Sequence, residues 1–419
     1  MREMLLVLLA AAAPVFSQNA DPKALALLLN QQALDARSKG SAAGADRLTL
    51  EALTAAEESN DPISISTCLH NRAMVLRELR RYSEAEPLQR RVVSIMESLN
   101  AKPHHLAMGL QTLASLLFIT GRPAEAEPLL RRAASFGIRR EAPFVASLVW
   151  NSFGEVLYAL GQDREAESCF RNALAANVLI RSVSNDDVFQ YTLVAGENKE
   201  RLEALILNNQ GLVFYRSGQL QQAEKCWRRS IGLYTKESNA TASIGSPMAN
   251  LGELLRFKKQ FPEAADYLTQ ALSLFERTIG PESFRVALVT NLLANALMET
   301  GDLAQARRLY ERALNLCIKI AGEQHAQTGV ILSNLAELEL RTGATSKAME
   351  LFSKSLSILE ASLGPNHPTL IPTLTGQAAL LRKLGRKRDA KIAESRWKSI
   401  QSLQGSPATI SLEDLYAGR

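Results

Sequence analysis

The feature that most constrains this chain is a short string that returns at nearly constant spacing. The segment SEAEPLQRR at Ser83 returns as AEAEPLLRR at Ala124, and one alanine marks each of nine copies, the first of them faint. Successive alanines lie 40, 41, 40, 57, 41, 42, 42 and 42 residues apart. A fixed period of this length is typical of a stacked repeat protein. We call these alanines the anchors: Ala45, Ala85, Ala126, Ala166, Ala223, Ala264, Ala306, Ala348 and Ala390.

Two further positions keep the same register and predict a helical hairpin in each copy. Twelve residues before the anchor, all nine copies carry Ala or Gly. Five residues before it, seven copies carry Gly, and the other two carry Arg80 and Lys259. Apolar residues at helical spacing flank this Gly, which is suited to the left-handed end of a helix. We therefore expect two closely packed helices per copy, with Pro87 and Pro128 in the first turn of the second helix.

This pattern resembles the tetratricopeptide repeat family, and the 42-residue period resembles its kinesin-light-chain variety. The string Gly364-Pro365-Asn366-His367-Pro368 matches the inter-repeat segment of that variety. An asparagine in the first helix also recurs as it does there, at Asn71, Asn209, Asn250 and Asn334. The resemblance covers about residues 24–402. It implies an all-α, right-handed superhelical solenoid of about nine helix-turn-helix repeats over residues 18–402, followed by a flexible tail at 403–419.

Composition excludes several other classes of protein. Hydrophobic residues make up 46% of the chain and charged residues 22%, which is typical of a folded protein. The net charge of +5 is too diluted over 419 residues to indicate nucleic acid. No G-x-S-x-G, Walker loop, dinucleotide fingerprint or H-E-x-x-H motif occurs. We therefore predict no enzyme, no catalytic residue, no metal site, no cofactor and no nucleic-acid partner.

The N-terminus predicts export. Residues Met4 to Phe16 form a 13-residue apolar stretch, shorter than the roughly 20 residues of a membrane-spanning helix. Its length fits a signal peptide over residues 1–17, with cleavage between Ser17 and Gln18. We expect a secreted or periplasmic protein with no stable membrane insertion after cleavage. An uncleaved membrane anchor and a cytosolic chain are the alternatives.

Cysteine and histidine residues are predicted to be structural. The four cysteines follow no metal or redox spacing, and Cys169 and Cys226 occupy equivalent helix positions in successive repeats. Neighbouring helices pack about 8–10 Å apart, beyond the usual disulfide separation, so core thiols are expected. His325 and His367 fall in loops between repeats, where structural capping is favoured, and His104-His105 is expected to be a surface pair.

The resemblance assigns the binding site to a groove, because first helices line the concave wall in this family. Asparagine amides both donate and accept hydrogen bonds, tyrosine adds rigid contact area, and arginine recognises carboxylates. The alternative, left open for the recurring asparagines, is that they bond between neighbouring repeats. The predicted groove residues are Asn151, Glu155, Tyr158, Asn208, Asn209, Tyr215, Arg216, Asn250, Glu253, Arg256, Asn291, Asn295, Asn334, Glu337 and Arg341.

Two segments depart from the regular array. The 57-residue spacing marks an insertion of about 15 residues near 180–201. We expect a local structural elaboration there, with a flap over the groove as the alternative. The last repeat is rich in Lys and Arg, which suits a polar cap, with an acidic-membrane or nucleic-acid patch as the alternative. Its basic residues are Arg382, Lys383, Arg386, Lys387, Arg388, Lys391, Arg396 and Lys398.

These observations predict a non-catalytic scaffold that binds a peptide segment or a partner protein in its groove. Two other functions stay open at this point. One is an accessory or ligand-binding subunit of an envelope enzyme or transport system. The other is a cytosolic regulator with an uncleaved N-terminus.

Overall fold

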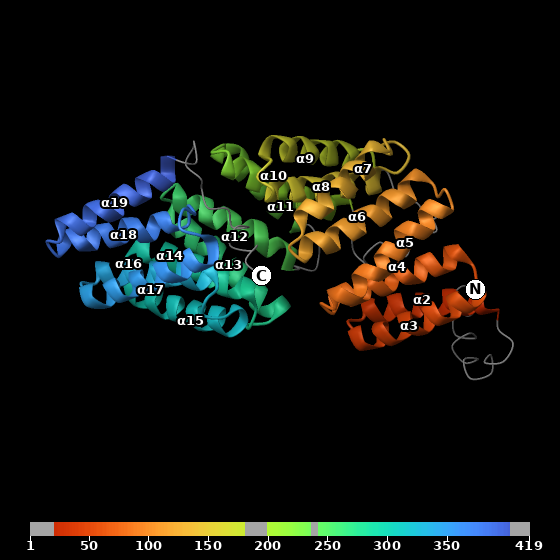
Figure 1. Cartoon of the computed structure of the whole chain (residues 1–419), viewed down its shortest axis with the longest axis horizontal. Coiled ribbons are helices and arrows are strands. Elements are labelled where there is room, and N and C mark those ends of the chain that lie inside the picture. The colour runs from red at the N-terminus through yellow and green to blue at the C-terminus, as the bar shows by residue number, and fades with distance from the viewer. Residues whose placement is uncertain (1–20, 181–198, 236–241, 403–419) are drawn as a thin grey trace. The chain divides into compact units, whose positions relative to one another are not determined.

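The computed structural model describes residues 21–180, 199–235 and 242–402, and every regular element in these ranges is an α-helix (Figure 1). None of the helices in these ranges is both long and apolar enough to cross a bilayer. The helices are α2 Pro22–Ser38, α3 Ala42–Ser59, α4 Pro62–Glu78, α5 Tyr82–Ser98, α6 Pro103–Ile119, α7 Pro123–Ser135, α8 Pro143–Ala159, α9 Asp163–Asn177, α10 Lys199–Arg216, α11 Leu220–Tyr234, α12 Ala242–Phe257, α13 Phe261–Ile279, α14 Phe284–Thr300, α15 Leu303–Ala321, α16 Ala326–Arg341, α17 Thr345–Leu363, α18 Leu370–Lys383 and α19 Lys387–Ser402.

The helices pair into hairpins as the repeat predicts, beginning with α2 and α3, so the faint copy at Ala45 is a full hairpin. The chain divides into two compact units, residues 1–202 and residues 203–419. In each unit, consecutive helices pack against one another. The predicted signal peptide at 1–17 and the predicted tail at 403–419 lie outside the described residues.

Most of the predicted insertion also lies outside the described residues, but both of its ends are placed. The Asn177 side chain donates to the Lys199 carbonyl at 3.2 Å, and Lys199 Nζ donates to the Ile180 carbonyl at 3.2 Å. The chain therefore returns to the point from which it left the repeat array.

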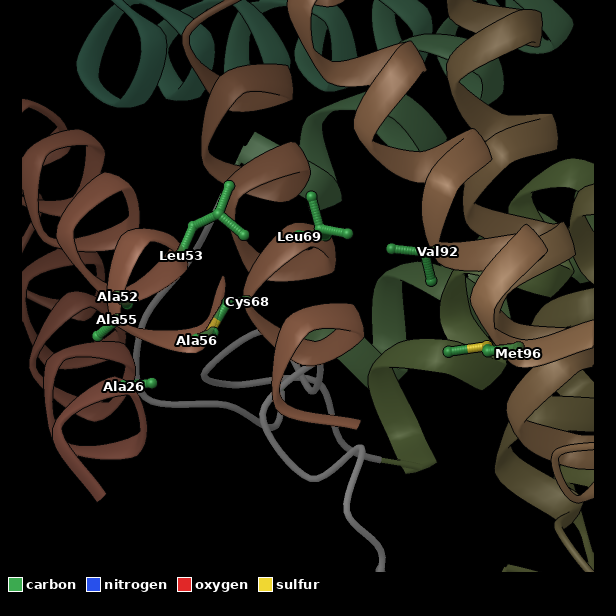
Figure 2. Close-up of a cluster of buried hydrophobic side chains, with 9 residues drawn as sticks. All are labelled: Ala26, Ala52, Leu53, Ala55, Ala56, Cys68, Leu69, Val92 and Met96. Atoms are coloured by element: carbon green, nitrogen blue, oxygen red, sulfur yellow. The ribbon is translucent and has the colours of Figure 1, made fainter. Parts of the chain in front are cut away.

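Close contact between the two helices of a hairpin depends on small residues. All nine anchors are at most 1% exposed. Figure 2 shows the core of the first repeats, where Leu53, Leu69 and Val92 come from α3, α4 and α5. Some positions twelve before the anchor admit only glycine. A Cβ atom added at Gly154 would lie 2.6 Å from the Phe170 ring, and one at Gly211 would lie 2.5 Å from Trp227 Nε1.

Every first helix ends with the same left-handed turn. The residue five before the anchor has a positive φ in all nine repeats, including Arg80 at 59° and Lys259 at 61°. The backbone N–H of the next residue then donates to the carbonyl five residues earlier, at 2.8–3.1 Å. This closes the helix with the bond of a Schellman motif. The predicted glycine caps are confirmed, and at two sites the turn forms without glycine.

Two other predictions have different outcomes. Pro87 and Pro128 do not lie in a first turn: each is the sixth residue of its helix, because α5 begins at Tyr82 and α7 at Pro123. Placing these prolines in a first turn requires a longer turn between the two helices than the structure has. In α7 the first helical position is occupied by Pro123 instead. The cysteine prediction is confirmed, since Cys68, Cys169, Cys226 and Cys317 are all buried free thiols.

The left-handed turns predict that glycine stabilises the two exceptional repeats. A residue with a Cβ atom pays about 1–2 kcal/mol for this conformation, while glycine loses more entropy on folding. Arg80→Gly and Lys259→Gly should each raise the free energy of unfolding by about 0.5–1 kcal/mol. Urea unfolding followed by circular dichroism measures this. The converse substitution Gly121→Arg, at the same repeat position with φ of 79° and open space around it, should destabilise the chain. Destabilisation by Arg80→Gly and Lys259→Gly would contradict this account.

Candidate partner-binding face

The first helices of successive hairpins lie close to one another. In the first unit α2 contacts α4 and α6 contacts α8, and in the second unit α12, α14, α16 and α18 contact in sequence. Successive second helices make no comparable contact among the described elements. The first helices therefore form the more closely spaced side of each stack, which is where the sequence places the groove.

Side-chain hydrogen bonds join these first helices in a constant register. They link the residue fifteen before one anchor to the residue fourteen before the next. Asn250 Nδ2 donates to Asn208 Oδ1 at 3.0 Å, and Asn334 Nδ2 donates to Asn291 Oδ1 at 3.0 Å. The equivalent pair in the first unit is Gln111 Nε2 to Ser152 Oγ at 2.9 Å. We call these six residues the polar ladder.

The polar ladder gives several predicted groove residues a structural bond. Asn208, Asn250 and Asn291 are at most 8% exposed, and the Asn208 amide also donates to Asn209 Oδ1 at 3.2 Å. The alternative left open for Asn250 and Asn334, bonding between repeats, is what the structure shows. Contact of these asparagines with a ligand stays a prediction.

More accessible side chains lie towards the C-terminal end of the first helices in the second unit. They occupy positions eleven and seven before the anchor, which are one helical turn apart and share a face. We call them the charged rows. In α10, α12, α14 and α16 seven of these residues are at least partly exposed, and they form the rows: Glu253, Asn295, Glu337, Arg216, Phe257, Glu299 and Arg341.

Arginine–glutamate pairs connect the charged rows. Arg341 Nη2 contacts Glu299 Oε1 at 2.7 Å, from α16 to α14, and Arg341 Nε contacts Glu337 Oε1 at 3.2 Å. Arg256, one residue before Phe257, binds Glu253 through Nε at 2.8 Å and Nη2 at 2.7 Å. The Arg256 side chain retains 29% exposure.

Two tyrosines flank Arg256. Glu253 raises the pKa of Arg256 most, so the guanidinium is a permanent charge. Burial raises the pKa of both tyrosines, which keeps their hydroxyls protonated. The Tyr310 hydroxyl donates to Asn295 Oδ1 at 2.7 Å. The face can therefore offer a cation, carboxylates and hydrogen-bonding groups side by side.

Sequence reasoning missed three members of this site. Phe257, Glu299 and Tyr310 were not among the predicted residues, although Phe257 and Glu299 share the position of Arg216 and Arg341, seven before the anchor. Phe257 is 53% exposed, so it presents an aromatic ring on this face. Their position in the repeat would have been enough to predict both Phe257 and Glu299.

The predicted residues of the fourth repeat belong to the first unit. Asn151 and Tyr158 are 3% and 2% exposed, and Glu155 is half-buried. They are therefore not part of the charged rows.

The histidines in the inter-repeat loops have the predicted structural role. His325 Nδ1 accepts from the Gln327 backbone N–H at 3.1 Å, and His367 Nδ1 accepts from the Thr369 N–H at 3.3 Å. His104 and His105 are half-buried, with ring centroids 4.3 Å apart. The described residues contain no group of three or more metal-ligating side chains.

A separate open depression has a volume of about 560 Å³. It is lined by α15 and by Pro281 and Glu282, with Arg308, Glu311 and Arg312 among the α15 residues. None of the charged rows contributes to it.

The comparison with known families decides the family. The tetratricopeptide repeat model matches residues 64–137, 202–277 and 285–361, which is more than half of the chain. The chain belongs to the tetratricopeptide repeat family. Proteins of this family are generally non-catalytic scaffolds that bind protein or peptide partners. No curated protein matches the chain.

Two of the solved structures that align with this chain share its fold. The apo quorum sensor NprR from B. thuringiensis aligns at 13% identity over 85% of this chain and 94% of its own, with a TM-score of 0.61. A Rap protein complexed with Competence and Sporulation Factor aligns at 13% identity over 85% and 100%, with a TM-score of 0.54. A chain from Podosopora anserina described as a kinesin light chain with nearly identical repeats aligns at 20% identity over 50% and 100%, with a TM-score of 0.39.

The hydrogen bonds of the polar ladder predict that its asparagines contribute to the free energy of unfolding. Asn250→Ala leaves the buried Asn208 oxygen without its donor, so the free energy of unfolding should fall by about 1–3 kcal/mol. Asn315→Ala is the matched control, because the Asn315 side chain is exposed on α15 and makes no hydrogen bond to the described residues. Urea unfolding of both variants tests this. Equal stability of Asn250→Ala and Asn315→Ala would show that the ladder bond contributes nothing.

Proposed function

We propose that the charged rows and Arg256 form the surface with which this tetratricopeptide protein binds a peptide segment of a partner protein. The observation that carries the proposal is the placement of Arg256 and Phe257 on α12 and of Arg341 on α16, with their side chains still accessible. Accessible arginines and aromatics are the residue types that dominate binding energy at protein interfaces. The protein acts in this proposal as a scaffold, without catalysis or cofactor.

Each part of the surface has a chemical task. When the partner binds, the paired arginines leave their own glutamates and bind carboxylates of the partner. This exchange costs little free energy because each arginine remains paired with a carboxylate. Phe257 supplies rigid apolar contact area. Asn295, whose oxygen accepts from Tyr310, retains an amide that can donate to a backbone carbonyl.

Two of the aligned structures support a ligand-binding use of this fold. NprR is a quorum sensor, and the Rap protein was solved with Competence and Sporulation Factor bound. At 13% identity these structures share the fold, but they do not identify equivalent binding residues. The site proposed here therefore depends on the charged rows alone.

Export is part of the same proposal. The 13-residue apolar stretch at Met4–Phe16 supports it, with Gln18 as the first residue of the mature chain. The partner is then a protein of the bacterial envelope or its exterior.

The test begins with partners captured from the native host and identified by mass spectrometry, and then measures affinity with each purified partner. Arg256→Gln/Arg341→Gln removes two cations from the proposed surface. Each charged hydrogen bond is worth about 1.5–3 kcal/mol, so Kd should rise by roughly tenfold or more. The same mass spectrometry reads the N-terminus of the native protein, and an intact Met1 in soluble protein would contradict export.

The control is Arg228→Gln/Arg312→Gln on the second helices. These arginines have similar exposure, 41% and 39%, and also pair with glutamates. This variant should keep both affinity and melting temperature. Equal affinity of the two double variants for every partner would overturn the proposed surface.

A further inference from the structure

The last hairpin carries a second exposed surface, on the outer face of α19. One side of this helix packs inward, with Ile400 and Trp397 against Leu359, Leu370 and Leu374. The other side is exposed. Lys387, Lys391 and Lys398 are spaced by four and seven residues, so they share one stripe of the helix. Arg388, Ile392 and Ser395 form the adjacent exposed stripe.

This face is positively charged without compensation. The two acidic residues of α19 are already paired, Glu394 with Arg382 at 2.6 Å and Asp389 with Arg386 at 2.7 Å. In the part of the chain that the structure describes, no acid lies within 4.0 Å of Lys387, Arg388, Lys391 or Lys398. We call these four residues the α19 cations.

A solubilising cap does not require this arrangement. The position one after the anchor carries glutamate in four earlier repeats, and two of these bind a cation of the following repeat, Glu86 with Arg122 and Glu224 with Lys258. The last repeat has Lys391 at this position. A cap needs only polar side chains of either sign, so the gathering of four cations without an acidic partner on one helix indicates attraction of an anionic partner.

Two exposed apolar side chains indicate which anionic partner fits. Ile392 is 62% exposed beside Lys391, and Leu384 is 46% exposed at the turn between Lys383 and Arg386. Apolar side chains surrounded by lysine and arginine suit a lipid surface, where the former enter the headgroup boundary and the latter contact phosphates. Among the described residues this face has no exposed aromatic ring of the kind that favours single-stranded nucleic acid, since Trp397 is half-buried.

We propose that the outer face of α19 binds the surface of an anionic phospholipid bilayer. The binding is peripheral and reversible. It would hold the protein at a membrane and leave the charged rows to bind the partner. The α19 cations supply the long-range attraction, and Ile392 and Leu384 add a short-range contact.

The experiment measures cosedimentation of the full chain with vesicles of phosphatidylcholine alone or of phosphatidylcholine mixed equally with phosphatidylglycerol. The apolar segment at Met4–Phe16 would bind both vesicle types, so the readout is the preference for the anionic ones. Replacing the four α19 cations with Gln should reduce that preference by up to roughly a thousandfold. Ile392→Ser should weaken binding by several-fold. Raising the salt from about 0.1 M to about 1 M should abolish the preference.

The matched control removes four exposed cations from other second helices: Arg164→Gln, Arg171→Gln, Lys225→Gln and Lys354→Gln. It has the same net charge as the α19 variant and should retain the preference. An equal loss in both variants would assign the effect to net charge and overturn the proposal. The absence of any preference for anionic vesicles in the parent chain would also overturn it. Capture of a single-stranded oligonucleotide by α19 without vesicle binding would replace the lipid with a nucleic acid.

Discussion

Close helix contact at the nine anchors is the constraint on which the rest of this structure depends. A hairpin of two helices cannot bury its apolar sides alone, so each repeat must pack against the next. The buried anchor alanines, and the Ala or Gly twelve residues earlier, keep the helices near enough for that stacking. At Gly154 and Gly211 even a methyl group would overlap an aromatic ring of the partner helix. Some side-chain contacts between neighbouring repeats then recur in the same register.

Side chains with the same position in successive repeats therefore meet their counterparts. On the second helices, the arginine six residues after an anchor pairs with the glutamate twelve residues after the preceding anchor. The pairs are Arg91–Glu57, Arg132–Glu97, Arg312–Glu276 and Arg396–Glu360. Such exposed pairs add little stability individually, but they balance charge along the outer side. Against this pattern, α19 gathers four cations without an acidic partner among the described residues on one helix.

The sequence predicted those parts of the fold that depend on local backbone chemistry. Glycine five residues before the anchor specifies a left-handed helix end, and small residues at a constant spacing specify close helices. Arg80 and Lys259 adopt the same turn because the packing of their repeats outweighs the local cost. Pro87 and Pro128 were misplaced because the helix start depends on the length of the preceding turn, which a proline rule does not report.

The candidate site was harder to predict because the type of a residue does not show whether its side chain is buried. Asn208, Asn250 and Asn291 share the polarity expected of a ligand-binding residue, yet the spacing of neighbouring helices brings their amides into contact with each other or with the next repeat. Phe257 was not among the predicted residues. Its position seven before the anchor, shared with Arg216, Glu299 and Arg341, determines its exposure.

The central claim is that the first-helix face of the second unit divides into a buried polar ladder and accessible charged rows. Thiol labelling of single cysteine substitutions tests it most directly. Burial of the four native cysteines raises the pKa of Cys68 and Cys169 to about 12 and that of Cys226 to about 11, so their background reaction is slow. Phe257→Cys and Glu299→Cys should react quickly. Asn250→Cys and Asn291→Cys, on the same two helices, should react roughly a hundredfold more slowly, because they need local opening. Equal rates at all four positions in folded protein would contradict the division.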